Sequence, residues 1–209
     1  MKQQQILDAR LSDWRKLIRA LHARFLTGDF AKGLAFVTAV GKAAERAGHH
    51  PDVNLTYSFV DLKLISHDVS QVTQRDIDLA RQISEIARAQ GIESNPSGLA
   101  EIELALDSAD LAAAGPFWAA LLDGGFTGDD VVAPDGRLPS LWFQHTDAHE
   151  TPRQRFHLDL WLPHDIAEER IAAAVAAGGR VVYDDEAPAF VVLADPEGNK
   201  ACVCTFLNR

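Results

Sequence analysis

The sequence lacks both the long apolar runs of membrane proteins and the basic clusters of proteins that bind nucleic acids. No uninterrupted apolar run reaches the ~18 residues that a membrane span requires, and the polar start MKQQQILDARLSDW lacks the apolar stretch of a signal peptide. Lys and Arg number 20 against 30 Asp and Glu, a formal net charge of -10. Because no basic run offsets this charge locally, a phosphate backbone would be repelled. We therefore expect a cytoplasmic protein that binds neither a membrane nor nucleic acid directly.

Cysteine is equally scarce. The only two, Cys202 and Cys204, are separated by one residue, so both would point to the same face of a strand. We interpret them as small core residues, with a redox or metal-binding role as the alternative.

The first half of the 209-residue chain alternates between helical and strand periodicity. The pattern predicts helices over 6–20, 29–47 and 73–90, and strands over 20–26 and 54–66. Gly48 fits the position after a helix end, and Thr73 with Asp76 fits a capping box. Within 54–66 the apolar residues change face at Phe59–Val60, which indicates a bulge or bend. Such interleaving favours a sheet with two or three helices on one face.

The second half repeats one pattern, in which a strand, an aspartate, an amphipathic helix, two glycines and short strands follow one another. The repeats begin with EIELALDSAD (101–110) and FHLDLWLPHD (156–165), so we predict a duplicated strand–helix–strands module. The Gly-, Ser-, Asn- and Pro-containing segment GIESNPSGL (91–99) is typical of a linker. We therefore expect an α+β protein with domains over residues 1–92 and 99–209.

Two adjacent histidines follow the helix-ending glycine in ERAGHHPDV (45–53). An unperturbed imidazole has a pKa of ~6.5 and can give or take a proton near neutral pH. We expect His49 and His50 to lie in a loop, exposed to a cleft. His67 lies at the far end of the next strand and Asp76 opens the next helix, so an α/β layer could bring them to the same rim. Acid and base could then be different residues of one proton-transfer site.

The stretch GKAAERAGHHPDVNLTYSFVDLKLISHDVSQVTQRDIDLA (41–80) resembles the pterin-4a-carbinolamine dehydratase family. The family signature is an acidic residue, a His-His-Pro triplet, an aromatic residue, a later histidine and an aspartate. Here it falls on Glu45, His49, His50, Pro51, Tyr57, His67 and Asp76. GDFAKGLAFVTAV (28–40) is similar to the family's Asp-Phe helix, so the resemblance covers roughly residues 10–90.

The resemblance implies a hydro-lyase acting on a tetrahydropterin whose 4a-hydroxyl was left by an aromatic amino acid hydroxylase. It implies that His49 and His67 are acid and base on opposite sides of the ring and that His50 binds and orients the pterin. Asp76 would hold an imidazole in its useful tautomer, with Glu45 in a supporting role. No metal or organic cofactor is required. Since the family assembles as dimers or tetramers, we expect a homodimer or homotetramer.

Several of these residues have a second interpretation. Asp76 could accept the backbone N–H of Thr73 in the capping box, a role compatible with catalysis. Glu45 could be a solvated charge at a helix end, and Tyr57 could either line the pterin or fill the core. A zinc site of the three histidines is disfavoured, because adjacent residues rarely aim both side chains at one ion.

The second half resembles the vicinal oxygen chelate superfamily, the glyoxalase-like fold, over residues 99–207. The resemblance rests on FWAALL (117–122), RFHLDLWL (155–162) and LADPEGNKACVC (193–204). In metal-dependent members four side chains bind one divalent ion, and Glu103 and His157 stand at plausible ligand positions. Cys202 and Gln144 stand where carboxylates would be expected, so we favour a domain that binds a small ligand without metal.

The main functional hypothesis is therefore dehydration of 4a-hydroxytetrahydropterin to quinonoid dihydropterin by histidine acid–base catalysis. Two alternatives stay open: a non-catalytic module for pterin binding or dimerisation, and an activity that resides in a metal-dependent C-terminal domain.

Overall fold

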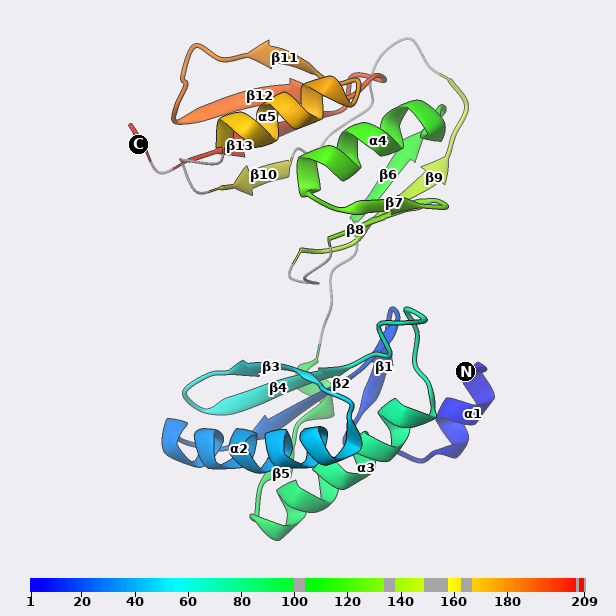
Figure 1. Cartoon of the computed structure of the whole chain (residues 1–209), viewed down its shortest axis with the longest axis vertical. Coiled ribbons are helices and arrows are strands. Elements are labelled where there is room, and N and C mark those ends of the chain that lie inside the picture. The colour runs from blue at the N-terminus through cyan, green and yellow to red at the C-terminus, as the bar shows by residue number, and fades with distance from the viewer. Residues whose placement is uncertain (100–103, 134–137, 149–157, 163–166, 206, 209) are drawn as a thin grey trace. The chain divides into compact units, whose positions relative to one another are not determined.

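A computed structural model describes residues 1–99, 104–133, 138–148, 158–162, 167–205 and 207–208 (Figure 1). The chain divides into two compact units, Met1–Glu101 and Ile102–Arg209, and each is described by itself. Across the described ranges, no helix combines the length and apolar character needed to cross a membrane.

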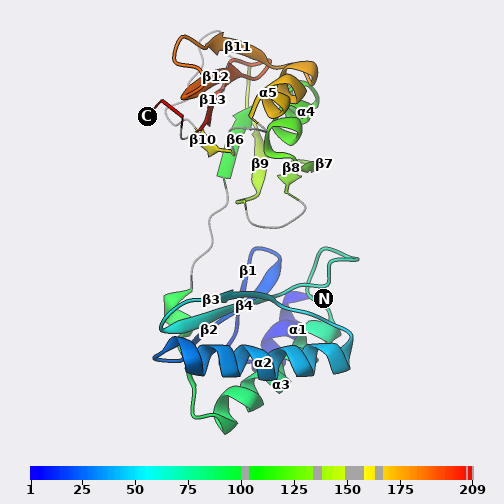
Figure 2. The same cartoon turned by 60° about the vertical axis from the view of Figure 1, so that its left-hand side comes forward.

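The first unit is built on an antiparallel sheet of five strands. The strands are β1 (Arg15–Leu17), β2 (Ala20–Leu26), β3 (Asp52–Leu55), β4 (Phe59–Leu64) and β5 (Glu93–Ser94). They pair in the order β1–β2–β4–β3, and β5 pairs with the end of β2. Helices α2 (Phe30–Ala47) and α3 (Gln74–Ala89) lie against one face of the sheet (Figures 1 and 2), and α1 (Gln3–Asp8) begins the chain. The predicted α+β arrangement with helices on one face is confirmed.

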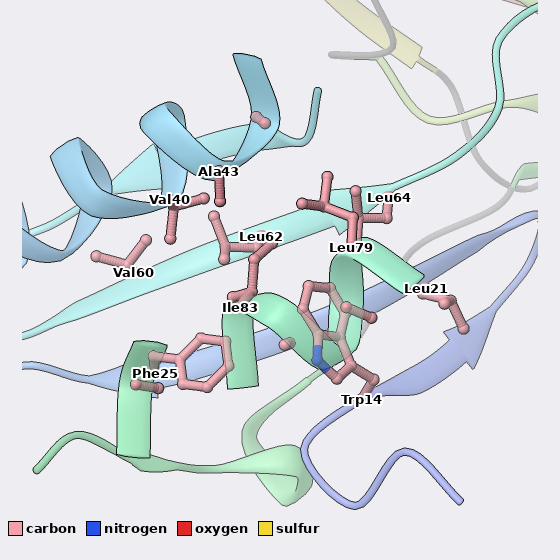
Figure 3. Packing of buried hydrophobic residues seen from close by; sticks show 14 of the residues in the cluster. Trp14, Leu21, Phe25, Val40, Ala43, Val60, Leu62, Leu64, Leu79 and Ile83 are labelled. Atoms are coloured by element: carbon pink, nitrogen blue, oxygen red, sulfur yellow. The ribbon is translucent and has the colours of Figure 1, made fainter. Parts of the chain in front are cut away.

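The core of the first unit lies between this face and the two long helices. Alternate side chains of β4 point inward, and the inward row is buried. The cluster in Figure 3 includes Trp14, Phe25, Val40, Val60, Leu62, Leu79 and Ile83. Full burial of one large apolar side chain contributes about 1.5–3 kcal/mol, so the cluster fixes α2 and α3 against β4. The ends of these elements are thereby fixed as well.

The predicted helix ends are confirmed. The side chain of Asp29 accepts the N–H of Lys32 at 2.8 Å at the start of α2, and Gly48 ends the helix in the left-handed conformation with φ of 58°. At the start of α3, Thr73 and Asp76 form the capping box, with the N–H of Thr73 donating to Asp76 at 2.7 Å.

The predicted helix over residues 6–20 is wrong. Helix α1 ends at Asp8, Arg10 takes a positive φ of 50°, and β1 begins at Arg15. The helical spacing of apolar residues misled the prediction, because Trp14 belongs to the core of the sheet. It is 3% exposed, and its Nε1–H donates to Ser84 Oγ of α3 at 3.1 Å.

The prediction of one strand over 54–66, with a bulge or bend at Phe59–Val60, is also wrong, because this segment forms the hairpin of β3 and β4. The chain reverses after Thr56, whose N–H and hydroxyl donate to the carbonyl of Phe59 at 3.0 and 2.8 Å. The change of apolar face therefore marks a turn. The expected linker contributes to structure too, since β5 and the 3₁₀ turn Pro96–Gly98 carry the first unit past residue 92.

The second unit contains two modules of the same topology. In the first, β6 (Leu104–Ser108) is followed by helix α4 (Leu111–Leu122), β7 (Gly125–Thr127), β8 (Asp130–Val132) and β9 (Leu141–His145). In the second, β10 (Leu158–Trp161) is followed by helix α5 (Ala167–Ala176), β11 (Arg180–Tyr183), β12 (Phe190–Ala194) and β13 (Lys200–Cys204). The strand orders β6–β9–β8–β7 and β10–β13–β12–β11 correspond, with the first and last strand of each module parallel. The predicted duplication is confirmed.

Two carboxylates in the segment DPEGN (195–199), between β12 and β13, hold the second module to the first. The buried Asp195 accepts the Nε1–H of Trp118 at 3.0 Å and the N–H of Asn199 at 2.8 Å. Glu197 accepts the N–H groups of Ala109 and Asp110 at 2.7 and 3.1 Å, just before α4. Both carboxylates thus have structural partners.

Candidate functional site

The topology of the first unit brings the expected chain ends together. Asp52 pairs with Lys63, so the start of β3 lies beside the end of β4. His49 and His50 precede β3, His67 follows β4, and Asp76 lies in the first turn of α3. Sequence reasoning placed these residues at a common rim, and the strand register provides the physical reason.

His49 and Asp76 form a buried pair, with 2.7 Å between His49 Nε2 and Asp76 Oδ1. Asp76 is fully buried and His49 is 8% exposed. The expectation that His49 lies exposed in a loop is therefore wrong. After the Gly48 cap, the backbone N–H of His49 donates to the carbonyl of Ala44 at 3.2 Å, which keeps the residue against the end of α2.

The second carboxylate oxygen of Asp76 is surrounded by donors. Asp76 Oδ2 accepts hydrogen bonds from Ser66 Oγ and Thr73 N, both at 2.7 Å, and from Thr73 Oγ1 at 3.3 Å. The hydroxyls of Ser66 and Thr73 are also 2.7 Å apart. Because an ionised group removed from water needs such partners, the network accounts for a fully buried carboxylate. Asp76 serves the capping box and His49 at the same time.

Ser66 is a residue of this network that the sequence reasoning missed. It is 1% exposed and continues the inward row of Leu62 and Leu64 on β4. A polar residue in an otherwise apolar inward row indicates a buried hydrogen bond. That alternation is the signal that could have identified Ser66.

His50 and Glu45 form a second, exposed pair. His50 Nε2 lies 3.1 Å from Glu45 Oε1, and the two side chains are 58% and 79% exposed. An exposed ion pair contributes about 0–1 kcal/mol to stability. Glu45 thus pairs with His50, whereas Asp76 pairs with the buried His49.

His67 is exposed in the loop between β4 and α3. Ser66 begins this loop, and its backbone N–H donates to the carbonyl of Gln71 at 3.3 Å. Arg75 pairs with Asp68 across the loop. The hydrogen bond from Arg75, followed by its charge, holds the pKa of the Asp68 carboxyl below its ordinary value of 3.8.

Tyr57 lies in the turn between β3 and β4 and is 73% exposed, so it does not fill the core. It lies five positions after Asp52, which is roughly 16 Å along an extended chain. Within one chain it therefore lies at the opposite end of the hairpin from His49.

The two metal candidates, Glu103 and His157, lie outside the described residues. Among the residues that the structure does describe, no three His, Cys, Asp or Glu side chains gather in a way that could hold a metal ion. Cys202 is half-buried and Cys204 is buried on β13, and neither forms a disulfide.

Comparison with known proteins separates the two halves of the chain. Residues 1–86 match the family model described as Pterin 4 alpha carbinolamine dehydratase, and residues 103–204 match the one described as Glyoxalase-like domain. Two relatives are both named "Putative pterin-4-alpha-carbinolamine dehydratase". The protein of Thermosynechococcus vestitus is 42% identical over 79 residues, 38% of this chain and 83% of the relative. That of Koribacter versatilis is 45% identical over 76 residues, 36% of this chain and 81% of the relative.

Solved structures also match each half. The transcriptional coactivator/pterin dehydratase from Brucella melitensis is 30% identical, with 42% of this chain and 97% of that chain covered and a TM-score of 0.40. A glyoxalase/bleomycin resistance protein/dioxygenase family enzyme from Burkholderia phytofirmans is 16% identical, with 50% and 97% covered and a TM-score of 0.40.

Proposed function

Because this chain belongs through its N-terminal half to the pterin-4a-carbinolamine dehydratase family, with a glyoxalase-like domain in its C-terminal half, we propose that it dehydrates 4a-hydroxytetrahydropterin. The observation that carries the proposal is the buried His49–Asp76 pair at the end of the sheet where His50 and His67 are exposed. A folding role alone would not call for three imidazoles at one rim.

The reaction needs one proton donor and one proton acceptor. The bond between carbon 4a and the hydroxyl oxygen breaks with its electrons on oxygen, and the acid's proton completes a water molecule. The base removes the proton of N5, and the electrons of that N–H bond form the double bond between N5 and carbon 4a. The product is quinonoid dihydropterin, and no external oxidant or reductant takes part.

The site residues divide these tasks by burial and charge. His49 and His67 are the acid and base, since a positioned imidazole exchanges protons near neutral pH. The exposed His50, oriented by Glu45, binds the pterin. Asp76 orients His49 and stabilises its charged form. Tyr57 is left out of this site, because it lies at the other end of the hairpin.

The test is a dehydratase assay in which an aromatic amino acid hydroxylase generates the carbinolamine in situ. Wild type should accelerate carbinolamine decay, and His49→Ala and His67→Ala should each lose about 10²–10⁴-fold of that acceleration. His145→Ala, which removes an exposed histidine of β9, is the matched control and should keep it.

Folded wild type without any acceleration would refute the proposal. Pterin binding without turnover would then support the non-catalytic module. Stoichiometric metal in the purified protein would instead direct attention to the C-terminal half.

A further inference from the structure

We infer that Ser66 is a positioning residue which, through Asp76, fixes the tautomer of His49 and makes His49 Nδ1 the ring atom that exchanges protons with the substrate. The tautomer follows from the hydrogen bonds alone. The part played in dehydration rests on the proposed function.

The two oxygens of the Asp76 carboxylate have different hydrogen-bond partners. Oδ2 already accepts from Ser66 Oγ and Thr73 N at 2.7 Å, whereas Oδ1 faces His49 Nε2. An ionised carboxylate only accepts hydrogen bonds. His49 Nε2 must therefore carry a proton, in the neutral as well as in the charged imidazole. The proton that His49 can exchange with a substrate is therefore the one on Nδ1.

The surroundings of Nδ1 agree with this role. The structure gives it no hydrogen-bond partner within the described ranges. In those same ranges the enclosed side-chain atoms without a partner are Thr27 Oγ1, Ser108 Oγ and Glu197 Oε2. The unpartnered Nδ1 of His49 is not among them, and the His49 side chain keeps 9% of its surface exposed. His49 thus buries one ring nitrogen against Asp76 and leaves the other accessible to a ligand.

Ser66 lies where it can influence both His49 and His67. Its hydroxyl donates to Asp76 and lies 2.7 Å from Thr73 Oγ1, which joins the end of β4 to the start of α3. Its backbone N–H closes the loop onto Gln71, and His67 is the next residue. Without the hydroxyl, Oδ2 keeps fewer donors and the carboxylate is less firmly held toward Nε2.

The test combines imidazole nitrogen NMR with the dehydratase assay on the full chain. In wild type we expect neutral His49 to carry its proton on Nε2, with slow exchange of that proton against solvent. Ser66→Ala should accelerate the exchange and lower kcat, each by roughly tenfold, with KM nearly unchanged. Ser66→Thr keeps the hydroxyl and should restore both.

Ser84→Ala is the matched control, because it also removes a partly buried hydroxyl, the partner of Trp14 Nε1. It should lower Tm without moving the His49 signals or kcat. Wild-type His49 with its proton on Nδ1 would overturn the inference, even if Ser66→Ala did not fold. A folded Ser66→Ala variant whose His49 Nε2 proton exchanges as slowly as in wild type, and whose kcat is unchanged, would overturn it too. A protein with the expected NMR signals but no dehydratase activity would refute the proposed function and leave the Ser66–Asp76–His49 coupling standing.

Discussion

Replacing Asp76 with asparagine changes a buried carboxylate into an amide of nearly the same shape. Three hydrogen bonds of 2.7 Å end on this carboxylate, from His49, Ser66 and Thr73. Each loses roughly 1 kcal/mol when its acceptor becomes neutral, and part of this loss is recovered because a neutral amide costs less to bury. We expect the free energy of unfolding of the first unit to fall by about 2 kcal/mol. That corresponds to a decrease in Tm of roughly 8–16 °C for a domain of this size.

The same substitution should impair catalysis more than folding. The single carbonyl oxygen of the introduced amide is best used on the Ser66 and Thr73 donors, which turns the amide N–H groups toward His49 Nε2. Two N–H groups cannot pair, so His49 must move its proton to Nδ1. The imidazole then presents the wrong tautomer to the substrate, and kcat should fall by about 10²–10⁴-fold.

Asp78→Asn is the matched control for this prediction, because it removes the same charge from the same helix. Asp78 is 55% exposed and accepts a hydrogen bond from Gln74 at 2.8 Å. Its replacement should change stability by no more than about 0.5 kcal/mol and leave kcat unchanged. Differential scanning calorimetry and steady-state dehydratase kinetics measure the two effects. If Asp76→Asn and Asp78→Asn have the same free energy of unfolding and the same kcat, the buried network neither stabilises the first unit nor orients His49.

Three further predictions concern packing, module docking and the loop of the site. Gly33→Ala would place a methyl 2.6 Å from a leucine methyl of β3, so the displacement of that side chain offsets the gain in helix propensity. Gly41→Ala meets nothing within 4 Å and should stabilise by roughly 0.5–1 kcal/mol. Gly33→Ala should therefore have the lower Tm of the two, and equal Tm values would contradict this. Glu197→Ala leaves two N–H groups before α4 without their acceptor and should lower the free energy of unfolding of the second unit alone by about 1–2 kcal/mol. Carboxyl NMR titration should find the pKa of Asp68 below 3.8 in wild type and near it in Arg75→Gln. Since the folded pKa is the lower one, the stabilisation by this pair is complete above the unfolded pKa and is lost as pH falls through the folded pKa; an unchanged pKa in Arg75→Gln would show that Arg75 is not the cause.

Local signals in the sequence predicted the elements that carry the site. A glycine after a helix, a capping box at Thr73 and the inward row of β4 depend on backbone geometry over a few residues, and the structure confirms them. The prediction failed where a pattern fitted two structures. The spacing around Trp14 fitted a helix, and the change of face at Phe59 fitted a bulge as well as a turn. Only the way in which the strands pair distinguishes these cases.

The sequence by itself determined the two halves of the chain, their α+β character and the histidines and aspartate that meet at one end of the first sheet. It did so because periodicity, caps and a fixed motif spacing are properties of neighbouring residues. The tertiary structure alone decided that His49 is buried against Asp76, that Ser66 completes the network and that Tyr57 lies at the far end of the hairpin. These outcomes depend on the register of β3 against β4 and on the packing of α3 beneath them, which bring together atoms from segments far apart in the chain.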